Sequence, residues 1–216
     1  MTARPDFSHP EVVAEQFGVS RESMARLQRY VDVLIRWNRS INLIGASTAE
    51  HIWQRHIADS LQLRRFLDTE QSLVDLGSGA GFPGLALALA FPEGSPAFAH
   101  LIESNRKKAA FLANAIRMTD APAGVIPKRI EEVDVTALVP QPAVAVARAL
   151  APLARLLQLA QGFLGAGLGA VFLKGQDVES ELTEAAKSWR IDADVYPSLV
   201  DASGRILVIR QAVHRN

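Results

Sequence analysis

The chain has 216 residues and a formal net charge of zero at pH 7, with 23 Lys and Arg against 23 Asp and Glu. It therefore lacks the strongly basic overall charge of many nucleic-acid-binding proteins. The absence of cysteine excludes disulfides, a thiol nucleophile and cysteine metal sites, and we expect no metal site. We also expect a cytoplasmic protein, because the amino terminus lacks a secretory signal and no apolar run reaches the ~18 residues of a membrane helix.

Residues 1–70 are predicted to form a helical extension that caps the rest of the chain. A capping box beginning at Ser8 predicts a first helix, and Ser20 is expected to cap a second helix with an apolar stripe. A further capping box beginning at Ser47 predicts a third helix.

Arginine is concentrated in residues 21–65, which carry eight Arg, no Lys and only four acidic residues. Because Arg suits phosphate and base recognition, this excess favours an RNA contact. The alternative, a coding bias toward Ala and Arg, stays open.

From about residue 72, strands and helices alternate, which is typical of an α/β protein with a mostly parallel sheet. A turn signal at residues 201–204 predicts that the last two strands form a terminal antiparallel hairpin. Residues 71–216 are thus expected to be one α/β domain, joined through a short linker near residues 68–71 and compact with the helical cap. The expected strands are 73–76, 98–102, 124–126, 144–147, 170–173, 191–196 and 205–209.

The most informative motif is the glycine-rich run that follows the first expected strand. Gly77, Gly79, Gly81 and Gly84 fall within eight residues, and an apolar helix-like stretch comes next. Glycine permits positive φ and a close approach of the backbone to a ligand. A strand, glycine turn and helix form the first half of a nucleotide-binding unit, with the ligand at the carboxyl end of the strand.

Three kinds of glycine loop are compatible with a nucleotide. A P-loop is excluded because no Lys follows. The dinucleotide frame Gly-x-Gly-x-x-Gly occurs at residues 79–84, but it starts late and contains Pro83. The earlier frame, Asp75-x-Gly-x-Gly-x-Gly, resembles motif I of class I S-adenosylmethionine-dependent methyltransferases, which implies contacts to the cofactor from Asp75, Gly77, Ser78, Gly79 and Gly81.

Glu103 ends the second expected strand and lies 22 positions after Gly81 (103 − 81). An acid at this spacing can accept hydrogen bonds from ribose hydroxyls. NAD also has such hydroxyls, so Glu103 alone does not distinguish NAD from S-adenosylmethionine. A helix is predicted over residues 105–118, with Lys107 and Lys108 on its solvated face.

Several further stretches resemble one family, the ribosomal small-subunit RNA methyltransferase G family, also called glucose-inhibited division protein B. The resemblance runs in order from about residue 37 to 175 and is far more specific than the glycine loop alone. The stretches are Trp-Asn-Arg-Ser-Ile-Asn-Leu (37–43), His-Ile-Ala-Asp-Ser-Leu (56–61), the loop with Phe-Pro-Gly (82–84), Arg-Ile-Glu-Glu (129–132), Val-Ala-Arg-Ala (146–149) and Leu-Lys-Gly (173–175).

The resemblance implies transfer of a methyl group from S-adenosylmethionine to N7 of one guanine in 16S ribosomal RNA. Carried over by position, Gly77 and Phe82 line the cofactor pocket, Ile130 and Glu131 flank the adenine, and Arg148 borders the reacting centre. Glu103 departs mildly, since Asp is also usual at its position in this family.

The expected chemistry needs positioning rather than a base, because guanine N7 carries a lone pair without prior deprotonation. In-line positioning supplies up to ~7–11 kcal/mol. Arg148 cannot act as a base, so we assign it to orienting the guanine or a phosphate. The alternative is an Arg that merely pairs with a carboxylate.

Other candidates lie outside the loop. His56 and Asp59 share a helical face, and with Ser60 they either contact the guanosine or cofactor or fix the cap against the sheet. Asn42 is a candidate base contact or a turn cap. Lys174 follows the fifth strand and is a candidate phosphate contact.

The target base must leave its stack, at a cost of a few kcal/mol. With no overall positive charge, we expect folded RNA or the small ribosomal subunit as substrate, and a monomeric enzyme. The alternatives are a methyltransferase with another acceptor, an NAD-dependent oxidoreductase, and a non-enzymatic RNA-binding assembly factor.

Overall fold

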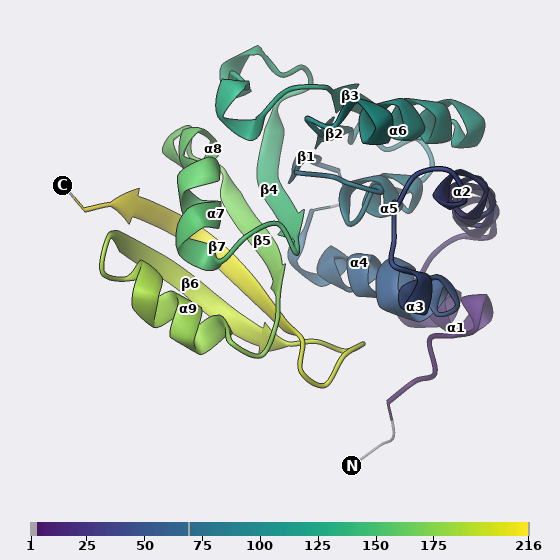
Figure 1. Ribbon diagram of the computed structural model, residues 1–216, viewed down its shortest axis with the longest axis horizontal. Coiled ribbons are helices and arrows are strands. Elements are labelled where there is room, and N and C mark those ends of the chain that lie inside the picture. The colour runs from purple at the N-terminus through teal and green to yellow at the C-terminus, as the bar shows by residue number, and fades with distance from the viewer. Residues whose placement is uncertain (1–3, 69, 216) are drawn as a thin grey trace.

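The computed structural model describes residues 4–68 and 70–215. Its centre is a seven-stranded sheet of order β3-β2-β1-β4-β5-β7-β6 (Figure 1). β1 to β5 are parallel, whereas β7 runs antiparallel to both β5 and β6. The expected α/β class and terminal hairpin are therefore confirmed. The strands are β1 Ser72–Leu76, β2 Ala99–Ile102, β3 Ala123–Ile126, β4 Pro142–Arg148, β5 Gly169–Lys174, β6 Trp189–Pro197 and β7 Arg205–His214.

Helices cover both faces of the sheet (Figure 1). Residues that alternate along the strands divide between two hydrophobic clusters, with Leu73 and Val146 in one and Val74 and Ala145 in the other. This is the pattern of strands buried on both faces. The helical elements are α1 Pro10–Phe17, α2 Arg21–Asn38, α3 Ala46–Ala49, the π-helix η1 Trp53–Ala58, α4 Asp59–Leu61, η2 Gln62–Phe66, α5 Gly84–Leu89, α6 Arg106–Thr119, η3 Ile130–Glu132, η4 Val135–Ala137, α7 Leu153–Leu159, α8 Gln161–Gly165 and α9 Val178–Ala185.

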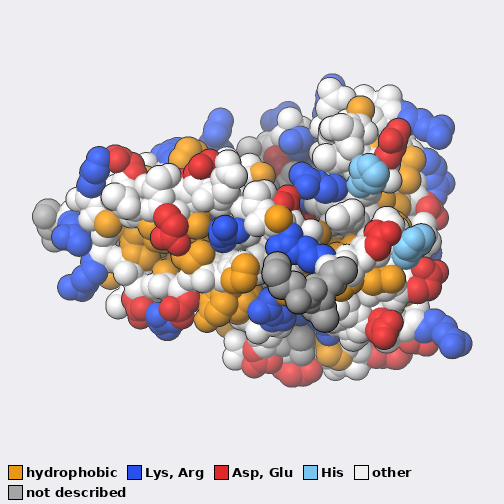
Figure 2. Space-filling view, turned by 90° about the horizontal axis from the view of Figure 1, so that it is seen from below, with side chains coloured by type: hydrophobic (Ala, Val, Ile, Leu, Met, Phe, Trp, Pro, Cys, Tyr) orange, Lys and Arg blue, Asp and Glu red, His pale blue; other side chains and the backbone are white. Residues whose placement is uncertain are grey.

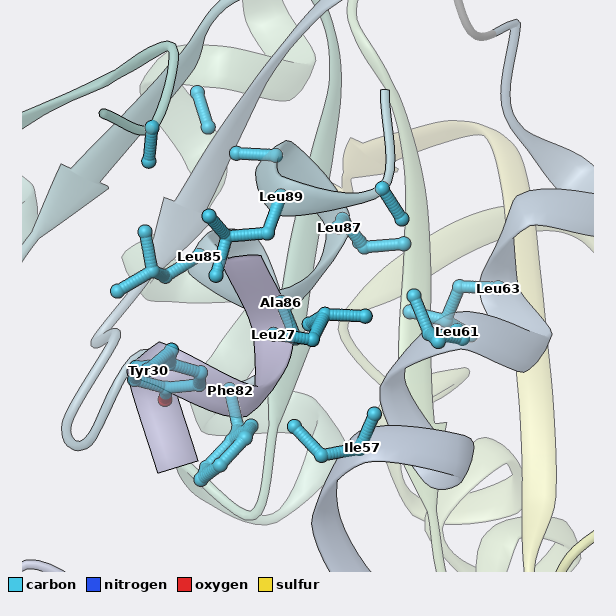
Figure 3. Packing of buried hydrophobic residues seen from close by; sticks show 14 of the residues in the cluster. Leu27, Tyr30, Ile57, Leu61, Leu63, Phe82, Leu85, Ala86, Leu87 and Leu89 are labelled. Carbon is cyan, nitrogen blue, oxygen red and sulfur yellow. The ribbon is translucent and has the colours of Figure 1, made fainter. Parts of the chain in front are cut away.

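The amino-terminal helices pack on the face that carries α5 and α6. Leu27 and Tyr30 of α2 belong to the same hydrophobic cluster as Leu85 of α5, and Tyr30 lies beside Phe82 with ring centroids 5.5 Å apart (Figure 3). The boundary expected near residue 70 remains a prediction, and Thr69 of the expected linker lies outside the described residues. None of the helices in the described ranges has the length and apolar character needed to cross a membrane.

Two sequence-based helix starts were wrong, whereas the cap at Ser20 is confirmed by its Oγ accepting from the Ser23 N–H at 3.1 Å. At the first helix, His9 and not Ser8 is the N-cap residue, and the His9 side chain makes no capping hydrogen bond in the described structure. At the third, Gly45 precedes α3 and Ser47 lies inside it. That helical segment is also interrupted, because α3 ends at Ala49 and η1 then winds as a π-helix.

The strand order reverses between β1 and β4. The chain passes from β1 to β2 and β3 on one side, then returns to place β4 on the other side of β1. Ligands of open α/β sheets bind in the crevice beyond the carboxyl ends of the strands at such a switch point. The topology therefore predicts a ligand site near Gly77 and Arg148, which lie at these two strand ends.

Candidate functional site

The glycine loop follows β1, and both Gly77 and Gly81 combine a positive φ with a lack of room for a Cβ. Gly77 has φ +73°, and a Cβ there would meet Leu150 Cδ1 at 2.6 Å. Gly81 has φ +94°, and a Cβ would lie 2.8 Å from the Tyr30 hydroxyl. That hydroxyl donates a hydrogen bond to the Ala80 carbonyl. Packing against Tyr30 of α2 therefore helps to set the shape of the loop.

Two carboxylates hold the loop from below and from the side. Asp75 is fully buried, its Oδ2 accepts from the Gly84 N–H at 3.0 Å, and its Oδ1 has no hydrogen-bond partner among residues 4–68 and 70–215. Burial raises the pKa of Asp75 to about 7. Glu103 Oε2 accepts from the Gly79 N–H at 2.9 Å, while its Oε1 accepts from the Asn105 N–H at 2.7 Å. Glu103 thus joins the loop to the start of α6.

A cavity of about 600 Å³ opens above this loop, at the expected strand ends. Asp75 and Gly81 lie beneath the cavity and are not among its lining residues. Most of the residues predicted to contact a cofactor do line it, namely Gly77, Ser78, Gly79, Phe82, Glu103, Ile130, Glu131 and Arg148.

The structure adds two groups of lining residues that sequence patterns missed. The first is the segment from Leu43 to Gly45, which Asn38 holds by accepting from the Leu43 and Ile44 N–H groups at 2.9 and 3.0 Å. The second group is cationic and consists of Lys108, Lys128, Arg129 and Arg155. Lys108 therefore differs from the expectation of a purely solvated side chain. The family-like stretch around Asn38 was the available signal for the first group.

Arg148 organises the wall between the sheet and η1. Its Nη2 donates to His56 Nδ1 at 2.8 Å, and its Nη1 lies 2.9 Å from the Arg55 carbonyl and 3.3 Å from Asp59 Oδ2. Its Cζ lies 5.0 Å from the centroid of the Phe82 ring. The contacts of both terminal nitrogens of Arg148 thus fix the π-helix to β4. The contact with Asp59 agrees with the alternative interpretation, in which this arginine pairs with a carboxylate.

His56 is held as a neutral imidazole. Its ring stacks on Phe82 with centroids 4.9 Å apart and planes 17° apart. Burial, together with the charges of Arg148 and Arg55, lowers the pKa of His56 to about 3. Because Arg148 can only donate, Nδ1 is the acceptor and the proton lies on Nε2. That Nε2 is buried without a hydrogen-bond partner within the described chain.

A second cavity of about 390 Å³ lies beside the first. The two cavities share His56, Arg148 and Ala149 as lining residues. Ala149 has φ +48°, in the left-handed region that costs an L-residue about 1–2 kcal/mol. Backbone strain of this kind clusters at functional sites. Two ligand-sized spaces therefore meet at the carboxyl end of β4.

The remaining sequence candidates are held in internal contacts or lie apart. Asp59 lines the second cavity, and burial raises its pKa against the lowering effect of Arg148. Ser60 is fully buried and donates to the His56 carbonyl at 2.7 Å. Lys174 lines the second cavity but pairs with Glu181 at 2.6 Å. Asn42 is exposed and lines neither cavity.

No group of three or more His, Asp or Glu side chains in the described ranges is arranged to hold a metal ion. The site instead offers backbone N–H groups, one acid at a strand end, an apolar wall and several cations. This set suits an organic nucleotide-like ligand.

Comparison with known proteins points to one family. A family model described as rRNA small subunit methyltransferase G matches residues 23–208. A curated relative of that name from Paramagnetospirillum magneticum is 47% identical over 204 residues, covering 94% of this chain and 95% of the relative. Another from Rhodospirillum rubrum is 45% identical over 208 residues, covering 95% and 98%.

Solved structures share the fold at much lower identity. The crystal structure of M. jannaschii TYW2 in complex with AdoMet matches with a TM-score of 0.53 and 14% identity, over 76% of this chain and 78% of that one. At this identity the likeness shows the fold alone, which is that of the class I methyltransferases.

Proposed function

We propose an activity for this chain, which belongs to the rRNA small subunit methyltransferase G family. It transfers the methyl group of S-adenosylmethionine to N7 of a guanine in 16S ribosomal RNA. The observation that carries this proposal is the meeting of two cavities at His56, Arg148 and Ala149. A transferase of this kind needs adjacent spaces for donor and acceptor.

The larger cavity fits the cofactor. Glu103 has taken one N–H on each carboxylate oxygen, and each oxygen retains a further lone pair for a ribose hydroxyl. Ile130 offers an apolar contact to the adenine, with Glu131 beside it. When bound, S-adenosylmethionine supplies an electrophilic methyl group on a sulfonium.

The smaller cavity is assigned to the guanine, and its chemistry is positioning. Guanine N7 needs no general base, and the two carboxylates that line this cavity, Asp59 and Asp201, are paired with Arg148 and Arg55. His56 stays neutral at physiological pH, because its pKa is lowered to about 3. A neutral imidazole adds no positive charge beside a sulfonium. The residues around the junction therefore orient the acceptor and exclude water, which is the main requirement for an in-line transfer.

The acceptor is taken to be folded RNA or the small ribosomal subunit, because the chain has zero formal charge and weak general attraction to naked RNA. Figure 2 shows acidic and basic side chains interspersed over the face it displays. We further infer a monomer in the cytoplasm.

The direct test is methyl transfer to small subunits that lack the modification, with the product base identified by mass spectrometry. The expected product is one 7-methylguanine in 16S RNA. Calorimetry with S-adenosylhomocysteine and with NAD separates the cofactors. Binding of NAD alone, or ribosome binding without turnover, would refute the proposal.

The loop assignment has its own variant. Gly77→Leu places a side chain where a Cβ already meets Leu150 at 2.6 Å and where the backbone lines the cavity. We expect at least a tenfold loss of S-adenosylhomocysteine affinity with a cooperative unfolding transition retained.

A further inference from the structure

The cations of the two cavities differ in their pairing. In the smaller cavity, Arg55 pairs with Asp201 at 2.9 Å and Lys174 with Glu181 at 2.6 Å. In the larger cavity, Lys108, Lys128 and Arg129 form no ion pair with any residue in the described ranges, although all three line it. Of the two cavities, it is therefore the larger one, assigned to the cofactor, whose lining includes cations without an ion-pair partner in the described ranges.

The cofactor itself does not account for these cations. The lining includes five cationic side chains, Lys108, Lys128, Arg129, Arg148 and Arg155, and two acidic ones, Glu103 and Glu131. The difference is a net charge of +3 (5 − 2), with His56 neutral. S-adenosylmethionine carries a sulfonium, an ammonium and one carboxylate, so its own net charge is also positive. The surplus positive charge opposes this ligand and suits a polyanion.

The three unpaired cations are also placed to be reached from outside. Lys128 and Arg129 are exposed and Lys108 is half-buried. Lys108 is near the start of α6, and the other two follow β3 directly. They therefore come from neighbouring elements at the carboxyl edge of the sheet, because β2, which leads into α6, pairs with β3.

We propose that Lys108, Lys128 and Arg129 bind backbone phosphates of the acceptor RNA, so that the RNA lies across the mouth of the larger cavity and retains the cofactor there. This inference rests on the proposed function and adds a docking surface and an order of events to it. The cofactor enters first, the RNA covers it, and the demethylated product leaves after the RNA.

Two physical effects act in the same direction. The phosphates neutralise a positive surface that repels the sulfonium, and the covering RNA slows escape from the cavity. If bound RNA raises the equilibrium affinity for the cofactor, thermodynamic linkage requires that the bound cofactor raises the affinity for RNA by the same factor. Because phosphate contacts release counterions, each lost contact also lowers the salt dependence of RNA binding, by about 0.7 units of the log–log slope for single strands.

The test compares two triple variants of equal charge. Lys108→Ala/Lys128→Ala/Arg129→Ala removes the proposed contacts. Arg106→Ala/Lys107→Ala/Arg117→Ala is the control, since these exposed residues of α6 line neither cavity. Dissociation of labelled S-adenosylhomocysteine, which lacks the sulfonium and so reports the covering effect alone, is measured with and without unmodified small subunits. The affinity for S-adenosylmethionine is measured for the free proteins.

Small subunits should slow dissociation at least tenfold for the wild-type protein and the control, and less than twofold for the first variant. That variant should also have a log–log salt slope lower by about two units, with S-adenosylmethionine affinity unchanged or increased. The inference is overturned if subunits do not slow dissociation from the wild-type protein, or if both variants behave alike.

A fivefold or greater loss of S-adenosylmethionine affinity in the free first variant would also overturn it, by assigning these cations to the cofactor's carboxylate. Methylation of 16S RNA by the wild-type protein is followed in parallel. The absence of methylation counts against the proposed function. Normal methylation, together with the same effect of small subunits on dissociation from both variants, counts only against this inference.

Discussion

The neutral state of His56 predicts a measurable loss of stability on acidification. Its pKa is about 3 in the folded protein, against about 6.5 for an unperturbed histidine. Below pH 6.5 the unfolded chain therefore binds a proton that the folded chain does not. The free energy of unfolding decreases by about 1.4 kcal/mol per pH unit in this window, which gives about 2 kcal/mol between pH 7.5 and pH 5.

The variant His56→Asn removes the titrating ring and leaves an amide oxygen near the position of Nδ1, where Arg148 donates. It should be less stable than the wild-type protein at pH 7.5, because the stack on Phe82 is lost. The difference between the two proteins should narrow by about 2 kcal/mol at pH 5.

Urea unfolding at both pH values provides the assay, because the linear extrapolation returns the free energy of unfolding directly. His51→Asn is the matched control, since His51 is exposed and lines neither cavity. A stability difference between wild type and His56→Asn that stays constant with pH would refute the claim that His56 is kept neutral by its surroundings.

Three further predictions concern the loop and its supports. Asp75→Asn tests a pH dependence of stability opposite to that of His56. The pKa of Asp75 is about 7 in the folded protein and 3.8 in the unfolded chain, so the wild-type protein loses stability as pH rises. The free energy of unfolding of the variant relative to wild type should then increase by about 2.6 kcal/mol from pH 5 to pH 8 in urea titrations, and no change would contradict it. Gly81→Ala should cost about 1–3 kcal/mol more than Gly18→Ala in thermal or urea unfolding, because both glycines have positive φ but only Gly81 lacks room for a Cβ; equal costs would contradict the packing argument. Glu103→Gln should weaken S-adenosylhomocysteine binding about tenfold or more in calorimetry, since one backbone N–H loses its acceptor. Glu131→Gln, whose carboxylate pairs with exposed Arg155, should have a smaller effect, and the reverse order would contradict the assigned roles.

Local patterns were sufficient for most of the fold. Every expected strand is present. The inner strands of a sheet covered on both faces are apolar runs that stand out in the chain, whereas the edge strand β6 mostly alternates partly buried and exposed residues. The glycine loop was identifiable for a similar reason, since positive φ at Gly77 and Gly81 restricts the residue type itself.

Helix starts and interruptions were less accessible to sequence patterns. The segment from Ser47 to Leu63 has a helical apolar pattern, yet it forms α3, a π-helix and shorter turns. Arg148 of β4 donates a hydrogen bond to the Arg55 carbonyl within this segment. Such a contact spans 93 positions and leaves no trace in the local pattern.

The chemistry of the site divides along the same line. Short-range signals in the chain identified the loop and the acid at Glu103, because each follows a strand, and the family resemblance singled out Arg148 at the end of β4. Only tertiary packing keeps His56 neutral and accepting from Arg148, turns Arg148 toward the π-helix, and places Lys108 and Lys128 in the lining of one cavity. Hydrogen-bond partners, burial and charge balance depend on residues that are distant in sequence, and these determine what each side chain is free to bind.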